Sequence, residues 1–255
     1  ITCTGNANCG NNLGSTFGTP IIRRLHNGQW AALFGNGLNS STGTAGLFVM
    51  LVDPATGGIT FRFIDTGAGP TMTGTTVTAR NGIAYVTSAD LDGDHVTDYV
   101  YAGDVLGNLW RFDLTSSDPT KWAASSAPIF KTAAGQPITT RVTVSSVLGI
   151  GAAGQPGVVV SFGTGQQFPQ TQVNSATYAS ATQALYGIWD WDMSGWNAKG
   201  GASAQYAALA SPQTVDTTTL QAQSITATQP GSGSISGYRT LSTNKVCWKG
   251  SPSCK

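Results

Sequence analysis

The chain has 255 residues, of which 40% are hydrophobic and only 10% charged, with a formal net charge of +1. This length suffices for one large domain or two small ones. The composition leaves no basic stripe for nucleic acid, no polybasic membrane-surface segment and no apolar run near the roughly 20 residues of a spanning helix, so we exclude nucleic-acid partners and direct membrane insertion.

Short apolar or alternating runs, separated by Gly, Asn, Asp and Pro, predict an all-β chain, because helical periodicity is nearly absent. In chain order we expect a turn and strand, a hairpin, a strand pair, and two further strand regions, at residues 27–37, 47–66, 96–114, 157–168 and 184–192. Between these, residues 167–183 are expected to form a surface loop. The Thr/Gln/Ser-rich residues 198–236 are expected to be an exposed insertion with at most one strand.

An internal repeat runs through these strands. The segments "AALFGNG", "DYVYAGD" and "GVVVSFGTG" each end an apolar strand at a glycine, namely Gly35, Gly103 and Gly163. A second strand ending in Asp follows each one. The repeat length of about 60–70 residues is typical of propeller blades with loop insertions. We therefore predict one modified β-propeller domain of short antiparallel blades over residues 1–255. Because only about four blades would fit, we expect these residues to be part of a longer protein.

The four cysteines fall at the two ends of the chain, at Cys3, Cys9, Cys247 and Cys254. Local pairs, Cys3 with Cys9 and Cys247 with Cys254, are the simplest of three possible connectivities. We favour disulfides over free thiols, and over zinc because neither pair has the close spacing of a zinc knuckle. Disulfides imply an oxidising compartment.

In the predicted loop at residues 88–104, four aspartates within nine residues make up a third of the acidic residues of a chain that has no glutamate. Their pattern, D-x-D-x-D-x-x-x-D, matches the first nine positions of an EF-hand loop. Asp90, Asp92, Asp94 and Asp98 occupy the side-chain ligand positions, and Val96 the position that offers its carbonyl. Two carboxylates at about 4 Å repel by roughly 4 kcal/mol at an effective dielectric of 20. We therefore predict one bound Ca²⁺, the flexible hard cation that accepts six to eight oxygens.

The loop departs from an EF-hand in three ways. Tyr101 stands where the bidentate glutamate would be, His95 stands where glycine is usual, and a strand follows in place of a helix. We therefore expect weaker affinity, in the micromolar to millimolar classes. The alternative is a solvated loop of Asx-turns, in which the aspartates cap backbone N–H groups without a cation.

Nothing in the sequence assembles a catalytic site. The two histidines, His26 and His95, fall in an expected hairpin turn and in the aspartate loop. Asp104 and Asp113 stand at strand ends, where turn formation is the usual role of aspartate. We therefore expect no enzyme and assign no catalytic residue.

These segments carry a resemblance to a known family. "FGTPIIRRLHNGQWAALFGNGLNS", "DLDGDHVTDYVYAGDVLGNLWRFDL" and "VVVSFGTGQ" resemble the C-terminal β-propeller domain of the PilY family, the type IV pilus biogenesis factors and tip adhesins. Carried over residue by residue, the calcium site of that family falls on Asp90, Asp92, Asp94, the Val96 carbonyl and Asp98.

The resemblance implies a non-enzymatic protein at the pilus tip (the fimbrium), outside the cell, reached by export through the periplasm and outer membrane. Its calcium occupancy would regulate pilus extension against retraction, and thereby twitching motility, surface adhesion and virulence. Minor pilins or other tip subunits would be its partners, together with a host-cell or abiotic surface.

Two other interpretations stay open at this point. An integrin-α-like propeller, acting as a general adhesion or ligand-binding module, uses nearly the same calcium loop but repeats it in successive blades. A quinoprotein dehydrogenase has similar blades, and "VDPATGGITFRF" resembles its repeat. Quinoproteins, however, resemble one another in adjacent cysteines and a calcium-binding glutamate, neither of which this chain contains.

Overall fold

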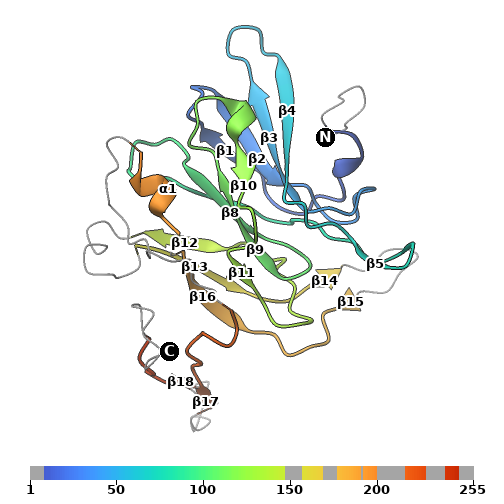
Figure 1. Ribbon diagram of the computed structural model, residues 1–255, viewed down its shortest axis with the longest axis vertical. Helices are drawn as coiled ribbons and strands as arrows, with labels where there is room; N and C mark the ends of the chain where they lie inside the picture. Colours follow the sequence, from blue (N-terminus) through green and yellow to red (C-terminus); the bar gives the residue numbers. More distant parts are fainter. Residues whose placement is uncertain are drawn as a thin grey trace, which may run out of the picture.

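The computed structural model describes residues 9–146, 157–168, 177–190, 192–199, 216–227 and 239–246. Within them the chain is almost entirely β-structure, as predicted, and every strand pair is antiparallel. Three larger sheets follow one another in chain order, from blue at the top of Figure 1 to orange at the bottom. No helix in the described residues is long and apolar enough to cross a membrane.

The first sheet has the order β1-β2-β3-β4 and is the most regular. Its strands are β1 (Ile21–Arg24), β2 (Trp30–Gly35), β3 (Gly46–Val52) and β4 (Ile59–Asp65). The hairpin predicted at residues 47–66 is β3 and β4, and the strand predicted within 27–37 is β2. Asp53 stabilises the β3–β4 turn by accepting hydrogen bonds from the Ala55 N–H and the Thr56 hydroxyl, at 2.8 Å each.

The second sheet has the order β10-β9-β8-β7, with β11 also paired to β9. Its strands are β7 (Thr87–Ala89), β8 (Tyr99–Gly103), β9 (Asn108–Asp113), β10 (Ala123–Ala124) and β11 (Phe130–Lys131). The predicted strand pair at 96–114 is β8 and β9. The aspartate loop is the connection from β7 to β8, so it projects from this sheet.

The third sheet joins β12 (Thr143–Ser146), β13 (Val158–Gly163) and β16 (Leu185–Trp189). Three small ladders pair β5 (Thr71–Thr73) with β6 (Thr76–Ala79), β14 (Gln167–Phe168) with β15 (Thr177–Tyr178), and β17 (Ile225–Ala227) with β18 (Arg239–Leu241). The short helices are η1 (Gly10–Asn12), η2 (Pro119–Lys121) and α1 (Ser194–Asn197). The predicted surface loop at 167–183 thus carries the β14–β15 ladder at its ends, and β17 lies inside the predicted insertion at 198–236.

The predicted internal repeat is present in three dimensions. Gly35, Gly103 and Gly163 are the last residues of β2, β8 and β13, the second strands of the three sheets. The residue after each glycine accepts a hydrogen bond from a backbone N–H at or just before the start of the next strand. Those acceptors are the Asn36 side chain from Gly46, the Asp104 side chain from Asn108 and the Thr164 hydroxyl from Ala184.

Two of these glycines are required by the close approach of neighbouring sheets. A Cβ at Gly35 would overlap the carbonyl oxygen and side chain of Ile83, and a Cβ at Gly103 would overlap the side chain of Ile138. Ile83 and Ile138 each lead into the first strand of the next sheet. Glycine at the strand end therefore lets each sheet pack directly against its successor.

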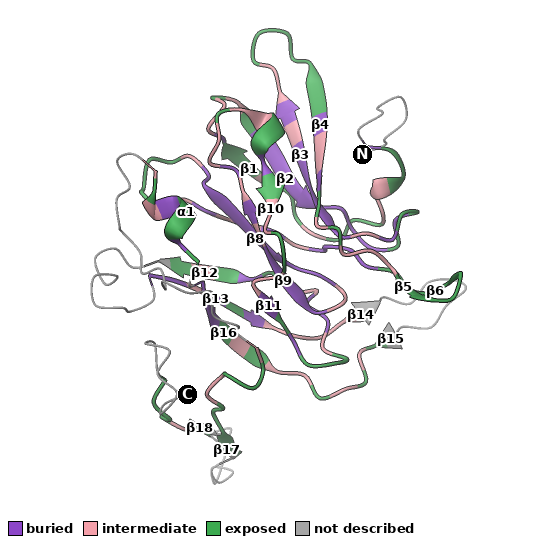
Figure 2. Cartoon of the chain, viewed as in Figure 1, coloured by how far each residue is buried: buried purple, intermediate pink, exposed green. Residues whose placement is uncertain are grey.

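The core lies in two layers on either side of the second sheet. Along β8, Val100 faces the first sheet while Tyr101 faces the third, because side chains alternate along a strand. All five residues of β8 are buried, and Figure 2 shows this strand as a purple ribbon in the centre of the fold. The outer face of the first sheet is less covered: Ile22, Trp30 and Ile59 are each more than half exposed. Three antiparallel sheets packed face to face in chain order are the arrangement predicted for successive propeller blades.

The N-terminal segment covers some of that outer face. Cys9 is buried with Phe34, Phe48 and Phe61, and it is disulfide-bonded. Cys3, Cys247 and Cys254 lie outside the described residues, so the predicted pairing remains a prediction.

Candidate metal centre

The predicted calcium loop begins after β7, which ends at Ala89, and ends before β8, which begins at Tyr99. Its backbone turns through two left-handed residues, Gly93 at φ +81° and His95 at φ +67°. The first aspartate fixes this turn: Asp90 accepts hydrogen bonds from the Gly93 N–H at 2.7 Å and the His95 N–H at 2.9 Å. Aspartates thus shape the loop locally before any long-range contact is made.

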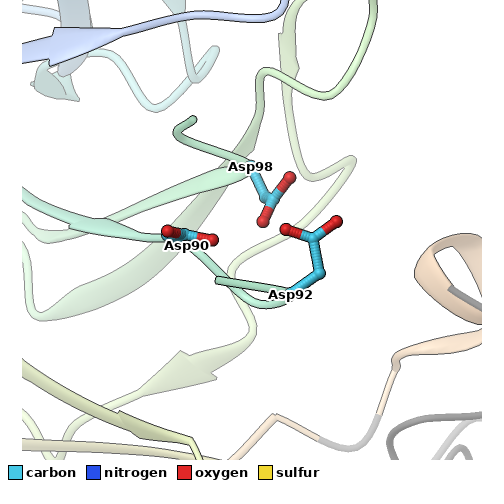
Figure 3. Close-up of side chains that lie close together, drawn as sticks. All are labelled: Asp90, Asp92 and Asp98. Atoms are coloured by element: carbon cyan, nitrogen blue, oxygen red, sulfur yellow. The ribbon is translucent and has the colours of Figure 1, made fainter. Parts of the chain in front are cut away.

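Three of the predicted ligands converge. Carboxylate oxygens of Asp90, Asp92 and Asp98 all lie within 4.8 Å of one another, and Figure 3 shows the three side chains pointing toward a common centre. Calcium binds oxygen at about 2.3–2.6 Å, so one ion reaches oxygens up to about 5 Å apart. The donor set and its spacing therefore fit a single Ca²⁺ ion.

Of the other two predicted ligands, Asp94 is not a member of this close group, and Val96 would offer its backbone carbonyl. Asp94 is exposed, and its Oδ1 accepts the Val96 N–H at 2.8 Å. Val96 itself is half-buried and forms a parallel bridge with Arg24 of β1. The structure thus brings together three of the four predicted carboxylates and leaves Asp94 outside the close group.

Asp98 is the most constrained member of the cluster, because it is fully buried. Its Oδ2 accepts the Leu91 N–H at 2.7 Å, and its Oδ1 lies 2.9 Å from Nε2 of His26. Burial raises the pKa of Asp98 to about 6, and the bonds from Leu91 and His26 only partly oppose that rise. An ionised carboxylate here therefore needs further positive charge.

Asp92 points to the same need. Partial desolvation raises its pKa, and repulsion from Asp94 and Asp90 adds to the rise against the opposing Asp94 N–H. Among the described residues, no lysine or arginine pairs with the cluster, and His26 is the one basic side chain in contact with it. A divalent cation would offset this uncompensated charge.

The Asx-turn alternative is also visible in this loop. The bonds from backbone N–H groups to Asp90, Asp92 and Asp94 are those it requires. A carboxylate has about four lone-pair sites, so these bonds leave lone pairs for a cation. The two interpretations are therefore compatible in geometry, and they differ in whether calcium binds.

Two long-range contacts could not be predicted from the sequence because they join distant residues. His26 does lie in the predicted turn, but its contact with Asp98 spans 72 positions and has no signature in the sequence. The second is a buried ion pair, in which Arg111 Nη1 lies 2.9 Å from Asp190 Oδ1 and ties the second sheet to the end of the third. The aspartate at the end of the later strand of each repeat, which is β16 in the third sheet, indicates the position of Asp190 but not its partner.

Asp104 is structural, as its place at a strand end suggested. It is fully buried, and its Oδ2 accepts hydrogen bonds from Asn81, Asn108 and Trp110 at 2.8–2.9 Å. These neutral donors supply the hydrogen bonds that the buried Asp104 carboxylate requires. The predicted histidine positions also hold, since His95 is exposed in the loop.

Comparisons with known proteins agree on one family. The model of the PilY1 beta-propeller domain matches residues 2–228. The type IV pilus biogenesis factor PilY1 of Pseudomonas aeruginosa strain PAK is 37% identical over 195 residues, covering 70% of this chain. In strain UCBPP-PA14 the identity is 32% over 266 residues, covering 92% of this chain. A PilY1 homolog of Xylella fastidiosa is 35% identical over 189 residues, covering 70%.

The fold gives the same answer. The crystal structure of the Pseudomonas aeruginosa PilY1 C-terminal domain aligns with a TM-score of 0.63 and 30% identity, covering 94% of this chain and 48% of that one. The chain spans only 12–20% of the length of these three curated relatives. With the family model matching most of its length, the chain belongs to the PilY1 β-propeller domain family.

Proposed function

We propose that this chain is the calcium-binding propeller segment of a type IV pilus biogenesis factor. The names of the relatives support the pilus role, and the family match favours it over the integrin-α-like and quinoprotein interpretations. The observation that carries the calcium proposal is the convergence of Asp90, Asp92 and Asp98 oxygens within 4.8 Å.

Asp90, Asp92 and Asp98 would hold the ion, with Asp94 and the Val96 carbonyl reaching it by small movements of the loop. Bound calcium supplies two positive charges that screen the repulsion between these carboxylates. The chain's own contribution is to preform the turn through the Asp90 hydrogen bonds and to keep Asp98 oriented. With calcium the connection from β7 to β8 becomes one rigid unit, and without it the loop loosens.

In the full-length protein this difference would set the balance between pilus extension and retraction, and with it twitching motility and surface attachment. The partners would be minor pilins or other subunits at the pilus tip, on the outside of the cell, together with the surface that the pilus touches. We propose no catalytic step, and hence no catalytic residue.

Calorimetric titration of calcium into the 255-residue chain tests the binding, with Asp98→Ala as the deficient variant and Asp53→Ala as the matched control. Asp53 lies in the exposed β3–β4 turn, away from the cluster. We expect binding in the unmodified chain and the control and none in Asp98→Ala. The same substitutions in the full-length protein should alter twitching motility for Asp98 only. If calorimetry gives the same calcium binding for all three proteins, the proposal is overturned.

A further inference from the structure

The first sheet makes a hydrogen bond on each side of the aspartate loop. Just before the loop begins, Arg23 Nε donates a 2.7 Å hydrogen bond to the hydroxyl of Ser88 in β7. Where the loop ends, the Thr97 N–H donates to the Arg24 carbonyl at 3.0 Å. Arg23 and Arg24 are the last two residues of β1, so one strand end spans the loop that belongs to the neighbouring sheet.

The third contact reaches the carboxylate cluster itself. His26, in the turn after β1, places Nε2 at 2.9 Å from Oδ1 of the buried Asp98. The second oxygen of Asp98 is held by the Leu91 N–H. Asp98 is therefore fixed by one partner from its own loop and one from the first sheet, which sets the direction of its remaining lone pairs toward Asp90 and Asp92.

The turn that carries His26 is itself well held. The Leu25 side chain is 1% exposed in the core between the first and second sheets. The Gly28 N–H donates to the Leu25 carbonyl at 2.9 Å, and the Gln29 N–H donates to the Asn27 side chain at 3.1 Å. Because its backbone is anchored on both sides, His26 can transmit a displacement of Asp98 to β1, and the reverse.

We propose that His26 is a positioning residue for the calcium ligand Asp98. We further propose that calcium binding strengthens the contact between the first and second sheets through the β1–β2 turn. The inference rests on the proposed calcium site and adds what the site acts on. Coupling of this kind is reciprocal. If calcium strengthens this contact by a given factor, formation of the contact strengthens calcium binding by the same factor.

Two substitutions separate positioning from packing. His26→Phe keeps the ring but removes the hydrogen bond, and His26→Gln keeps an N–H near the place of Nε2. Partners of a carboxylate ligand typically contribute about 10–100-fold to metal affinity. We expect calorimetry to give that loss for His26→Phe and recovery of most of it for His26→Gln. Affinity should be unchanged for the control Asp53→Asn, which alters the exposed β3–β4 turn.

Amide hydrogen exchange of the unmodified chain provides the second measurement, which does not depend on how any variant folds. Calcium is expected to slow exchange at Leu25 and Gly28, whose N–H groups are bonded inside the turn, as well as in residues 88–98. Unchanged affinity in His26→Phe, or slowing confined to residues 88–98, would overturn this inference and leave the calcium site standing. No binding by the unmodified chain would overturn the calcium proposal, and this inference with it.

Discussion

Replacing Asp98 with asparagine is expected to stabilise the calcium-free chain at neutral pH and to abolish its response to calcium. The Asp98 carboxylate is fully buried, and its pKa is raised from 3.8 to about 6 by that burial. At neutral pH the folded state therefore contains an ionised group that would be better solvated in the unfolded chain. Asparagine keeps an oxygen for the Leu91 N–H and a polar group for His26, without the charge.

The magnitude follows from the linkage between proton binding and folding. A carboxyl group whose pKa is higher in the folded state favours folding below its unfolded pKa, and that contribution is lost as the pH rises through the folded pKa. For Asp98 this stabilising contribution to folding is lost as the pH rises from about 4 to about 6. At about 1.4 kcal/mol per pKa unit, Asp98→Asn should raise the free energy of unfolding by about 3 kcal/mol at pH 7.5 and by about 1 kcal/mol at pH 4.5.

Urea unfolding with a chelator, at both pH values, measures this difference. Calcium at a hundredfold excess over its dissociation constant should then stabilise the unmodified chain by about 2.7 kcal/mol and leave Asp98→Asn unchanged. The control is Asp53→Asn, because hydrogen bonds from Ala55 and Thr56 lower the pKa of this exposed aspartate, so its substitution should not stabilise the chain. An Asp98→Asn chain that is less stable than the unmodified one at pH 7.5 without calcium would refute the reasoning.

Three further outcomes are expected. Calcium affinity, measured by calorimetry, should fall as the pH drops below about 6, because protons then compete for Asp98. Arg111→Met should cost about 3–5 kcal/mol in urea unfolding, because it leaves the buried Asp190 without its ion partner. Gly35→Ala should cost about 1–3 kcal/mol in the same assay, because the added methyl group overlaps Ile83.

Each of these has a contrary result. Calcium affinity that stays constant from pH 7.5 to pH 5 would mean that Asp98 does not bind the ion. The control for Arg111→Met is Asp192→Asn, since Asp192 is the half-exposed partner of the same arginine and should matter little; equal losses for the two would reject the buried pair as the main contribution. A Gly35→Ala chain as stable as the unmodified one would show that the sheets can separate slightly without cost.

The sequence predicted the features that depend on neighbouring residues. Alternating apolar runs located β2, β3, β8 and β9, and the spacing of Asp90, Asp92 and Asp98 located three carboxylates that do converge. Both kinds of feature are set within a strand or a single loop, where side-chain period and turn geometry decide the outcome.

What the sequence could not predict depends on how the sheets pack together. The contact of His26 with Asp98 and that of Arg111 with Asp190 join residues 72 and 79 positions apart, and neither pair has a local signature. Asp94, which lies outside the close group of carboxylates, is a further example. Its Oδ1 accepts the Val96 N–H, and the spacing of the aspartates alone does not predict that bond.

Crystals of the 255-residue chain grown with ample calcium test the central claim most directly, through an anomalous difference map. The account predicts one peak between Asp90, Asp92 and Asp98, at about 2.3–2.6 Å from an oxygen of each. A map with no peak at that position would contradict it, and the aspartates would then serve only to shape the loop.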